Sequence, residues 1–203
     1  MKIVVIGGTG LVGSKLVEKL RTDGHEPSSD FVVEGAQIVV DVSSASCNLL
    51  GAEWEAGVGH HVMLSMVGNG RLPDEEAVKA GPIPYTILRA THLFESIGSI
   101  ADSSTDGHTV QLPLVLVQPV AADDVASTLA DVAVGSPLND TVELAGPETF
   151  RLDELVRRVL KASDDTRPVT TDVHARLDDR SLITGDDARI ASTRFEDWIG
   201  QSS

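Results

Sequence analysis

Short apolar runs alternate with amphipathic stretches along the first half of the chain. Lys2–Ile6 is a β-branched apolar run that ends at two glycines, and it predicts a buried strand. Leu11–Thr22 carries apolar residues at helical spacing on one face and charged residues on the other, which predicts an amphipathic helix. Further apolar runs at Ala36–Val42, His60–Val67 and Tyr85–Arg89 predict strands of the same buried kind.

A shorter helix is predicted between the second and third of these strands, over Cys47–Ala56. Its large apolar residues stand at positions that can share one face of a helix. We therefore expect Leu49, Leu50 and Trp54 to face the protein interior.

The second half of the chain continues the alternation. Leu114–Val120 and Thr141–Leu144 predict strands, whereas Asp123–Val134 and Leu152–Ala162 predict helices with one apolar face. Strands that alternate with helices are typical of β-α-β units, which build a parallel sheet through right-handed crossovers. The sequence therefore predicts an α/β fold with a doubly wound parallel sheet.

Composition and charge narrow the class of protein. The length of 203 residues suits a single domain, and an apolar content of 41% is enough for a hydrophobic core. With 16 basic and 31 acidic residues, the chain has a net charge of −15, so we expect no nucleic-acid and no membrane partner. The lone Cys47 can form neither an internal disulfide nor a cysteine-rich zinc site, and no apolar run resembles a signal peptide or a membrane span. A cytoplasmic location is the resulting expectation.

One motif carries chemistry, and it lies between the first strand and the first helix. The segment Gly7–Gly13 reads Gly-Gly-Thr-Gly-Leu-Val-Gly, with Gly7, Gly10 and Gly13 spaced three apart. In that context the first glycine permits a tight turn, the second lets a pyrophosphate approach the backbone, and the third lets the helix pack closely on the sheet. The free amides of the first helical turn would then face the phosphates, so the motif indicates dinucleotide binding rather than a ligand-free glycine turn.

A phosphate-binding loop of the NTPase kind is the rival interpretation of these glycines. Gly8 and Gly13 have the interval that such a loop requires. The next residues are Ser14 and Lys15, however, whereas the loop requires lysine followed by serine or threonine. The transposition moves the ammonium to another face of the helix and argues against an NTPase.

The glycine motif and its surroundings resemble the short-chain dehydrogenase/reductase superfamily, and within it the atypical, NmrA-like branch of NAD(P)-binding proteins. The segments that carry the resemblance follow one another along most of the chain: Met1–Gly13, Gly57–Ser65, Pro82–Thr91, Val120–Ala126, Ala145–Glu148 and Leu152–Leu155. The resemblance implies a Rossmann fold with a dinucleotide-binding core at residues 1–120. Residues 121–203 would supply the remaining sheet and a small C-terminal region on the substrate side, within one domain of residues 1–203.

The resemblance also implies which residues contact the coenzyme. The pyrophosphate would be lined by Gly7, Thr9, Gly10, Leu11 and Val12. The adenosine ribose would be bordered by Asp41, Val42 and Ser43. The nicotinamide end would face Ser65, Met66 and Val67 on one strand and Arg89, Ala90 and Thr91 on the next. All of these positions follow predicted strands, in agreement with the rule that ligands bind beyond the carboxyl ends of the strands in open α/β sheets.

The chain departs from the family at the catalytic pair. The superfamily uses Tyr-x-x-x-Lys at the start of a helix, but Tyr85 and Arg89 lie on a predicted strand, and Lys79 has Glu75 four positions before it. Ser65 is the one counterpart of the usual Ser or Thr relay. The catalytic residues therefore stay unassigned.

Three segments are also shorter than the family pattern. They fall at residues 26–30, 43–48 and 72–76, where related folds carry mobile loops beside the coenzyme. One interpretation is that the printed sequence lacks loop residues at these places, including the missing pair. The alternative is a chain of this length that has kept coenzyme binding alone.

Histidines and an aromatic residue are the remaining candidates. His60 and His61 are neighbours on a predicted strand and would point to opposite faces, so we expect no shared metal ion. His92 follows the predicted nicotinamide-binding strand and is a candidate for substrate contact or proton transfer. Phe94 is a candidate for the substrate pocket and equally for the core.

These observations favour an oxidoreductase that transfers a hydride between NAD(P) and a small organic substrate. A non-catalytic NAD(P) sensor that controls a protein partner is the alternative, and a nucleotide-sugar or isoprenoid epimerase is a third. No clear acid stands where one would hold the ribose 2′-hydroxyl, because Asp30 alone is close, and this slightly favours NADP. A homo-oligomer is compatible with the sequence.

Overall fold

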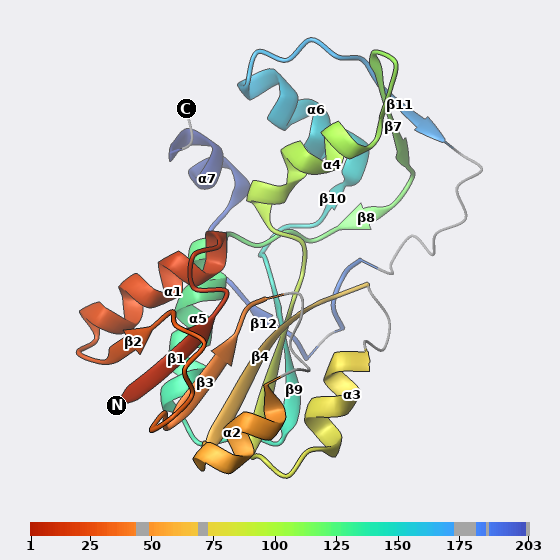
Figure 1. Cartoon of the computed structure of the whole chain (residues 1–203). Helices are drawn as coiled ribbons and strands as arrows, with labels where there is room; N and C mark the ends of the chain where they lie inside the picture. The colour runs from red at the N-terminus through yellow and green to blue at the C-terminus, as the bar shows by residue number, and fades with distance from the viewer. Residues whose placement is uncertain (44–48, 69–72, 173–181, 186, 202–203) are drawn as a thin grey trace. The chain divides into compact units, whose positions relative to one another are not determined.

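The computed structural model describes residues 1–43, 49–68, 73–172, 182–185 and 187–201. The chain folds into two compact units that interleave along the sequence (Figure 1). The first unit contains Met1–Ala90 and Ala122–Glu143, and the second contains Thr91–Ala121 and Leu144–Ser203.

A seven-stranded parallel sheet is the centre of the fold. Its strands are β1 (Lys2–Ile6), β2 (Glu26–Ser28), β3 (Ile38–Asp41), β4 (His60–Met66), β5 (Tyr85–Ala90), β9 (Asp140–Ala145) and β12 (Arg189–Ile190). The order across the sheet is β12-β9-β5-β4-β3-β1-β2. β12 pairs with Leu144 and Ala145 at the end of β9, which belong to the second unit. The strand order reverses at β1, because β2 lies on one side of it and β3 on the other.

Helices cover both faces of this sheet within the first unit. They are α1 (Leu11–Thr22), α2 (Leu50–Ala56), α3 (Pro73–Ala80) and α5 (Ala122–Val134). α1 and α5 lie together on one face, whereas α2 and α3 cover the other (Figure 1). Val78 of α3 packs there on Met63 and Ile87, and Leu50 of α2 contacts the same cluster. The predicted doubly wound α/β fold is confirmed.

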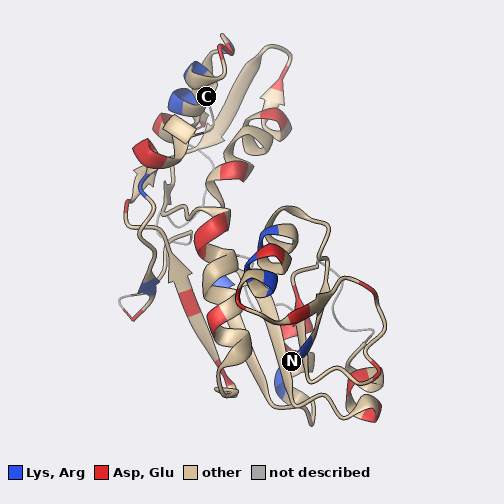
Figure 2. Cartoon of the chain, turned by 90° about the vertical axis from the view of Figure 1, so that its left-hand side faces the viewer, with Lys and Arg blue, Asp and Glu red and all other residues tan. Residues whose placement is uncertain are grey.

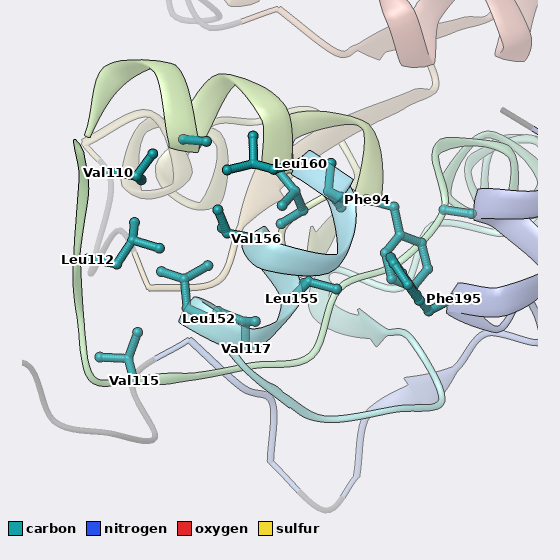
Figure 3. Close-up of a cluster of buried hydrophobic side chains, with 14 residues drawn as sticks. Phe94, Val110, Leu112, Val115, Val117, Leu152, Leu155, Val156, Leu160 and Phe195 are labelled. Carbon is teal, nitrogen blue, oxygen red and sulfur yellow. The ribbon is translucent and has the colours of Figure 1, made fainter. Parts of the chain in front are cut away.

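The second unit is built from short strands and helices around its own core. Its elements are η2 (Phe94–Ser96), α4 (Ile97–Ser103), β6 (Thr105–Asp106), β7 (Thr109–Pro113), β8 (Leu116–Val117), β10 (Phe150–Arg151), α6 (Leu152–Ala162), β11 (Val169–Asp172) and α7 (Phe195–Gln201). β11, β7 and β6 form one small sheet, and β10 pairs with β8. Aliphatic residues of α6 and β7 fill the core of the unit, and the Phe94 and Phe195 rings close it at one end (Figure 3).

The amphipathic and apolar patterns place several elements correctly. β1, α1 and α6 have the predicted bounds. The strand predicted over Leu114–Val120 is wrong in length, since β8 covers Leu116–Val117 and Leu114 is exposed. Trp54 was expected inside but is 57% exposed, because Glu53, its neighbour on α2, is the residue that α2 buries. Cys47 lies outside the described residues.

Candidate functional site

The turn from β1 to α1 is built as the glycine motif predicts. Gly7 has a φ of +80°, a left-handed conformation that favours glycine, and its carbonyl oxygen accepts a hydrogen bond from the Gly10 amide at 2.9 Å. A Cβ on Gly13 would overlap the Gly7 carbonyl oxygen and lie 2.7 Å from the Gly8 Cα. A Cβ on Gly10 would meet the Gly7 oxygen alone within 4 Å, at 3.3 Å. The backbone is therefore tightly packed at Gly13, where α1 meets the turn, and open at Gly10.

The start of α1 is electrostatically suited to an anion. Gly10 is the N-cap residue and supplies no side-chain hydrogen bond to the helix, and the first turn carries no acidic residue. The first intrahelical bond runs from the Ser14 amide to the Gly10 carbonyl, so the amides that precede it have no helical partner. Thr9, Gly10 and Leu11 are exposed around these amides. Free amides and the positive end of the helix dipole together form a site for phosphate.

The end of β3 lies directly against this turn. A Cβ on Gly7 would come within 3.1 Å of the Ser43 amide nitrogen and 3.2 Å of the Val42 carbonyl carbon. The fully buried Asp41 accepts hydrogen bonds through Oδ1 from the Ser43 amide at 2.8 Å and from the Ser43 hydroxyl at 2.7 Å. Its Oδ2 has no hydrogen-bond partner among the residues that the structure describes. The predicted pyrophosphate and adenosine residues thus meet where the strand order reverses, as open α/β sheets require of a ligand site.

The adjacent ends of β4 and β5 carry a cluster of charged and polar side chains. Ser65 and Arg89 are register partners on the two strands, and both contact Glu75 of α3. The Ser65 hydroxyl donates to Glu75 Oε1 at 2.6 Å, while Arg89 donates through Nε to Oε1 at 3.2 Å and through Nη2 to Oε2 at 2.5 Å. Lys79 donates to Oε2 at 3.2 Å, and Arg89 Nη1 lies 3.5 Å from Glu143. Two residues predicted for the nicotinamide end are therefore held by a third that the sequence did not single out.

The carboxylate of Glu75 is 1% exposed and ionised more easily than an ordinary glutamate. Burial by itself would raise the pKa of Glu75. Hydrogen bonds from Arg89, Ser65 and Lys79 outweigh burial, so the pKa lies below the usual value for glutamate. Glu75 is a negatively charged hydrogen-bond acceptor at neutral pH.

The other residues predicted for the nicotinamide end are distributed between the two units. Met66, Val67 and Ala90 belong to the first unit, where the Val67 amide donates to the Ala90 carbonyl at 2.8 Å. Thr91 is the first residue of the second unit, and its buried Oγ1 has no partner within the described ranges of the chain.

The substrate candidates His92 and Phe94 both lie in the second unit. Burial lowers the pKa of His92, and the buried His92 Nδ1 has no hydrogen-bond partner in the part of the chain that is described. Phe94 is fully buried and stacks on Trp198 with 5.3 Å between ring centroids, which agrees with the core interpretation of this residue.

His60 and His61 face different partners. The His60 Nε2 lies 3.0 Å from the Thr86 hydroxyl, whereas the His61 Nδ1 lies 2.7 Å from Glu53 Oε2 in a fully buried pair. The expectation that these neighbours point to opposite faces is confirmed. They lie near the amino end of β4, away from the carboxyl end that carries Ser65.

Buried histidines make the stability of the fold depend on pH. Burial lowers the pKa of both His60 and His92 below the ordinary value near 6.5. Below about pH 6.5 these two histidines are therefore protonated in the unfolded chain but stay neutral in the folded chain. We expect the unfolding free energy to be constant just above this pH and to fall as the pH decreases through it, by at most about 1.4 kcal/mol per pH unit for each residue.

Chemical denaturation between pH 8 and pH 5 measures this dependence. His60→Asn should reduce the slope, and His108→Asn is the control because His108 is exposed on the surface. A stability that stays constant as the pH falls through this range would contradict the expected loss.

The shortened segments differ in how they fold. Residues 26–30 form the short strand β2 and a turn in which the Asp30 amide donates to the Ser28 hydroxyl at 3.1 Å. Segments 43–48 and 72–76 fall partly outside the described residues. Tyr85 lies half-buried on β5 and packs against Met63 and Ile87. The interpretation of Tyr85 as a packing residue rather than a proton donor agrees with this position.

Comparison with solved structures finds a similar fold in two proteins solved with NAD and in one named as NADPH-dependent. The enzyme WbmG of Bordetella bronchiseptica, solved with NAD and UDP, has a TM-score of 0.68 at 14% identity, over 98% of this chain and 92% of that one. A short-chain dehydrogenase/reductase superfamily protein of Agrobacterium tumefaciens, solved with NAD, has a TM-score of 0.66 at 16% identity, over 100% and 96% of the two chains. The NADPH-dependent quinone oxidoreductase QOR2 of Escherichia coli has a TM-score of 0.66 at 18% identity, over 84% and 78%.

These likenesses confirm the predicted resemblance at the level of the fold. No family model matches the chain, and no curated protein matches its sequence. None of the helices in the described part of the chain combines the length and the apolar character needed to cross a membrane.

Proposed function

We propose that the protein binds NAD(P) and transfers a hydride between the nicotinamide and a small organic substrate. The observation that supports this most strongly is the β1–α1 turn, where uncapped amides at the positive end of α1 lie beside a backbone that only glycine allows. The turn follows β1 at the reversal of strand order.

The residues present fit the two halves of such a coenzyme. Gly7, Thr9, Gly10, Leu11 and Val12 would hold the pyrophosphate. Asp41, Val42 and Ser43 would border the adenosine ribose, and the unpartnered Asp41 Oδ2 is a ready acceptor for one of its donors. Ser65, Met66, Val67, Arg89, Ala90 and Thr91 would border the nicotinamide end. When bound, the coenzyme supplies the hydride, and the contribution of this chain is to bind and orient it.

The end of β2 favours NADPH over NADH in this proposal. Ser28 is the last residue of the strand and Ser29 follows it, and a Cβ on Gly8 would collide with the Ser29 side chain, so Ser29 lies beside the turn. Asp30 is the nearest acid, and its carboxylate accepts a hydrogen bond from the Ser28 hydroxyl at 3.2 Å. Asp30 stays charged, but it lies two residues beyond the end of β2, and a serine rather than an acid occupies the strand end where an acid would repel a 2′-phosphate. We expect a lower Kd for NADPH than for NADH in fluorescence titrations, and a lower Kd for NADH would contradict this preference.

A non-catalytic NAD(P) sensor acting on a protein partner is the second candidate. Two observations favour it: Tyr85 lies on a strand rather than at a helix start, and Arg89 is engaged by Glu75. A homo-oligomer would suit either function, as would the cytoplasmic location expected from the sequence.

A coupled binding and turnover experiment separates these functions. The purified protein is first titrated with NADPH and NADH, and the complex is then incubated with quinones, aldehydes, ketones and activated alkenes while nicotinamide absorbance is followed. Consumption of the reduced coenzyme with any of them supports the oxidoreductase. Tight binding without consumption supports the sensor, and no binding of either coenzyme contradicts both.

A further inference from the structure

The Glu75 carboxylate is the centre of the cluster at the carboxyl ends of β4 and β5. It is 1% exposed, and it accepts four hydrogen bonds from Ser65, Lys79 and Arg89. A buried carboxylate with this many donors has all its capacity satisfied, so its geometry is fixed. Because Ser65 and Arg89 sit side by side in the register of the two strands, Glu75 also fixes their side chains relative to each other.

The direction of the Ser65 hydrogen bond determines what this hydroxyl offers a ligand. Ionised Glu75 can only accept, so the Ser65 proton points to the carboxylate at 2.6 Å. Ser65 is itself 3% exposed, and its oxygen keeps its lone pairs for one further donor that reaches it. A ribose hydroxyl is such a donor, whereas a phosphate or a carbonyl oxygen is not.

Arg89 is engaged in a different way. Nε and Nη2 form a two-pronged contact with Glu75, and Nη1 lies 3.5 Å from Glu143. The cluster contains two acids, Glu75 and Glu143, and two bases, Lys79 and Arg89, so its net charge is zero. Unlike the start of α1, this cluster has no surplus positive charge among the described residues with which to attract a phosphate.

We propose that Glu75 is a positioning residue for the nicotinamide half of the coenzyme. It holds the Ser65 oxygen as an acceptor for a hydroxyl of the nicotinamide ribose, and it keeps Arg89 as a rigid support beside that hydroxyl rather than as a phosphate ligand. This inference rests on the proposed coenzyme binding, and it assigns the contribution of Glu75 to one half of the ligand.

The test compares the whole coenzyme with the half that Glu75 should not affect. The Kd values of NADPH and of 2′-phospho-ADP, which lacks the nicotinamide riboside, are measured for the wild type and for Glu75→Gln. We expect Glu75→Gln to weaken NADPH binding about tenfold, the equivalent of one good hydrogen bond, and to leave 2′-phospho-ADP within about twofold. A purely structural loss would weaken both ligands alike.

Glu53→Gln is the matched control, because it breaks another buried carboxylate pair near the amino end of the same strand β4. It should lower the melting temperature without changing the ratio of the two Kd values. If Glu75→Gln does not fold, Ser65→Ala removes the acceptor while leaving the Arg89–Glu75 contact, and it should raise the Kd of NADPH about three- to tenfold, again without affecting 2′-phospho-ADP.

The outcomes distinguish a failure of coenzyme binding from a failure of the role proposed for Glu75. A wild type that binds neither ligand contradicts coenzyme binding itself. A wild type that binds both, with a Kd ratio unchanged in Glu75→Gln and in Ser65→Ala, overturns the role of Glu75 while leaving coenzyme binding intact.

Discussion

Gly13→Ala is expected to lower NADPH affinity at least about tenfold and to destabilise the fold by about 3 kcal/mol. The added Cβ would overlap the Gly7 carbonyl oxygen and lie 2.8 Å from the Gly7 carbonyl carbon. Both neighbours are backbone atoms, so α1 must move away from the turn to make room. That movement displaces the amides that would hold the pyrophosphate. Coenzyme titration and chemical denaturation of the same variant measure the two effects.

Gly51→Ala is the control for this substitution. Gly51 lies in α2 of the same unit, and a Cβ there would meet nothing within 4 Å. Because alanine has a higher helix propensity than glycine, the unfolding free energy of this variant should rise by up to about 1 kcal/mol. Its Kd for NADPH should stay unchanged. Wild-type affinity in Gly13→Ala would show that close packing of α1 on the turn does not govern coenzyme binding.

Gly146→Ala is expected to destabilise the second unit by about 3 kcal/mol or more. Gly146 follows β9 where the chain passes Pro119, and a Cβ would overlap the Pro119 carbonyl oxygen and lie 2.8 Å from its carbon. The Gln118 side chain also donates to the Gly146 carbonyl at 2.9 Å, which fixes the two segments together. Separating them would disturb β8 and the end of β9.

Thermal denaturation followed by tryptophan fluorescence in a Trp54→Phe background measures this effect, because the remaining Trp198 packs on the core of the second unit. Gly98→Ala in α4 is the matched control, since a Cβ there meets nothing within 4 Å. A melting transition of Gly146→Ala equal to that of the wild type would refute the close crossing at Pro119.

The sequence predicts most of the central sheet because its signals are local. β1 is a continuous apolar run that ends at glycines. α1 and α6 are amphipathic over their whole length, so the spacing of their apolar residues predicts their bounds. α2 is misread at Trp54 because the decisive contact is not local: Glu53 turns inward to His61, whose position on β4 depends on the fold. Hydropathy places a glutamate outside, and nothing in the pattern identifies its buried partner.

The second unit was harder to predict for a related reason. β7 and β11 pair although almost 60 residues separate them, as in the register of Val110 with Val169. Both are short and partly polar, so each lacks the continuous apolar character that marked the strands of the first unit. Their pairing is a property of the assembled core around Phe94 and Phe195.

In the candidate site, too, residues with a local signal were predicted and a residue whose role depends on distant contacts was not. Gly7, Gly10 and Gly13 are recognisable because each answers a backbone requirement that only glycine meets. Glu75 was not predicted, since a glutamate in an acid-rich helix start usually faces solvent. Figure 2 shows how many acidic positions the helices of both units carry. The available signal was Arg89 near the end of a predicted strand, because a partly buried cation there needs a carboxylate partner.

Amide hydrogen exchange with and without NADPH tests the central claim most directly, because it reports on the backbone of the β1–α1 turn itself. The account predicts that saturating NADPH slows exchange across Gly8–Gly13 and at the end of β3, while the exposed surface of α6 is unchanged. Exchange at the turn that stays equally fast in saturating NADPH and NADH would contradict it.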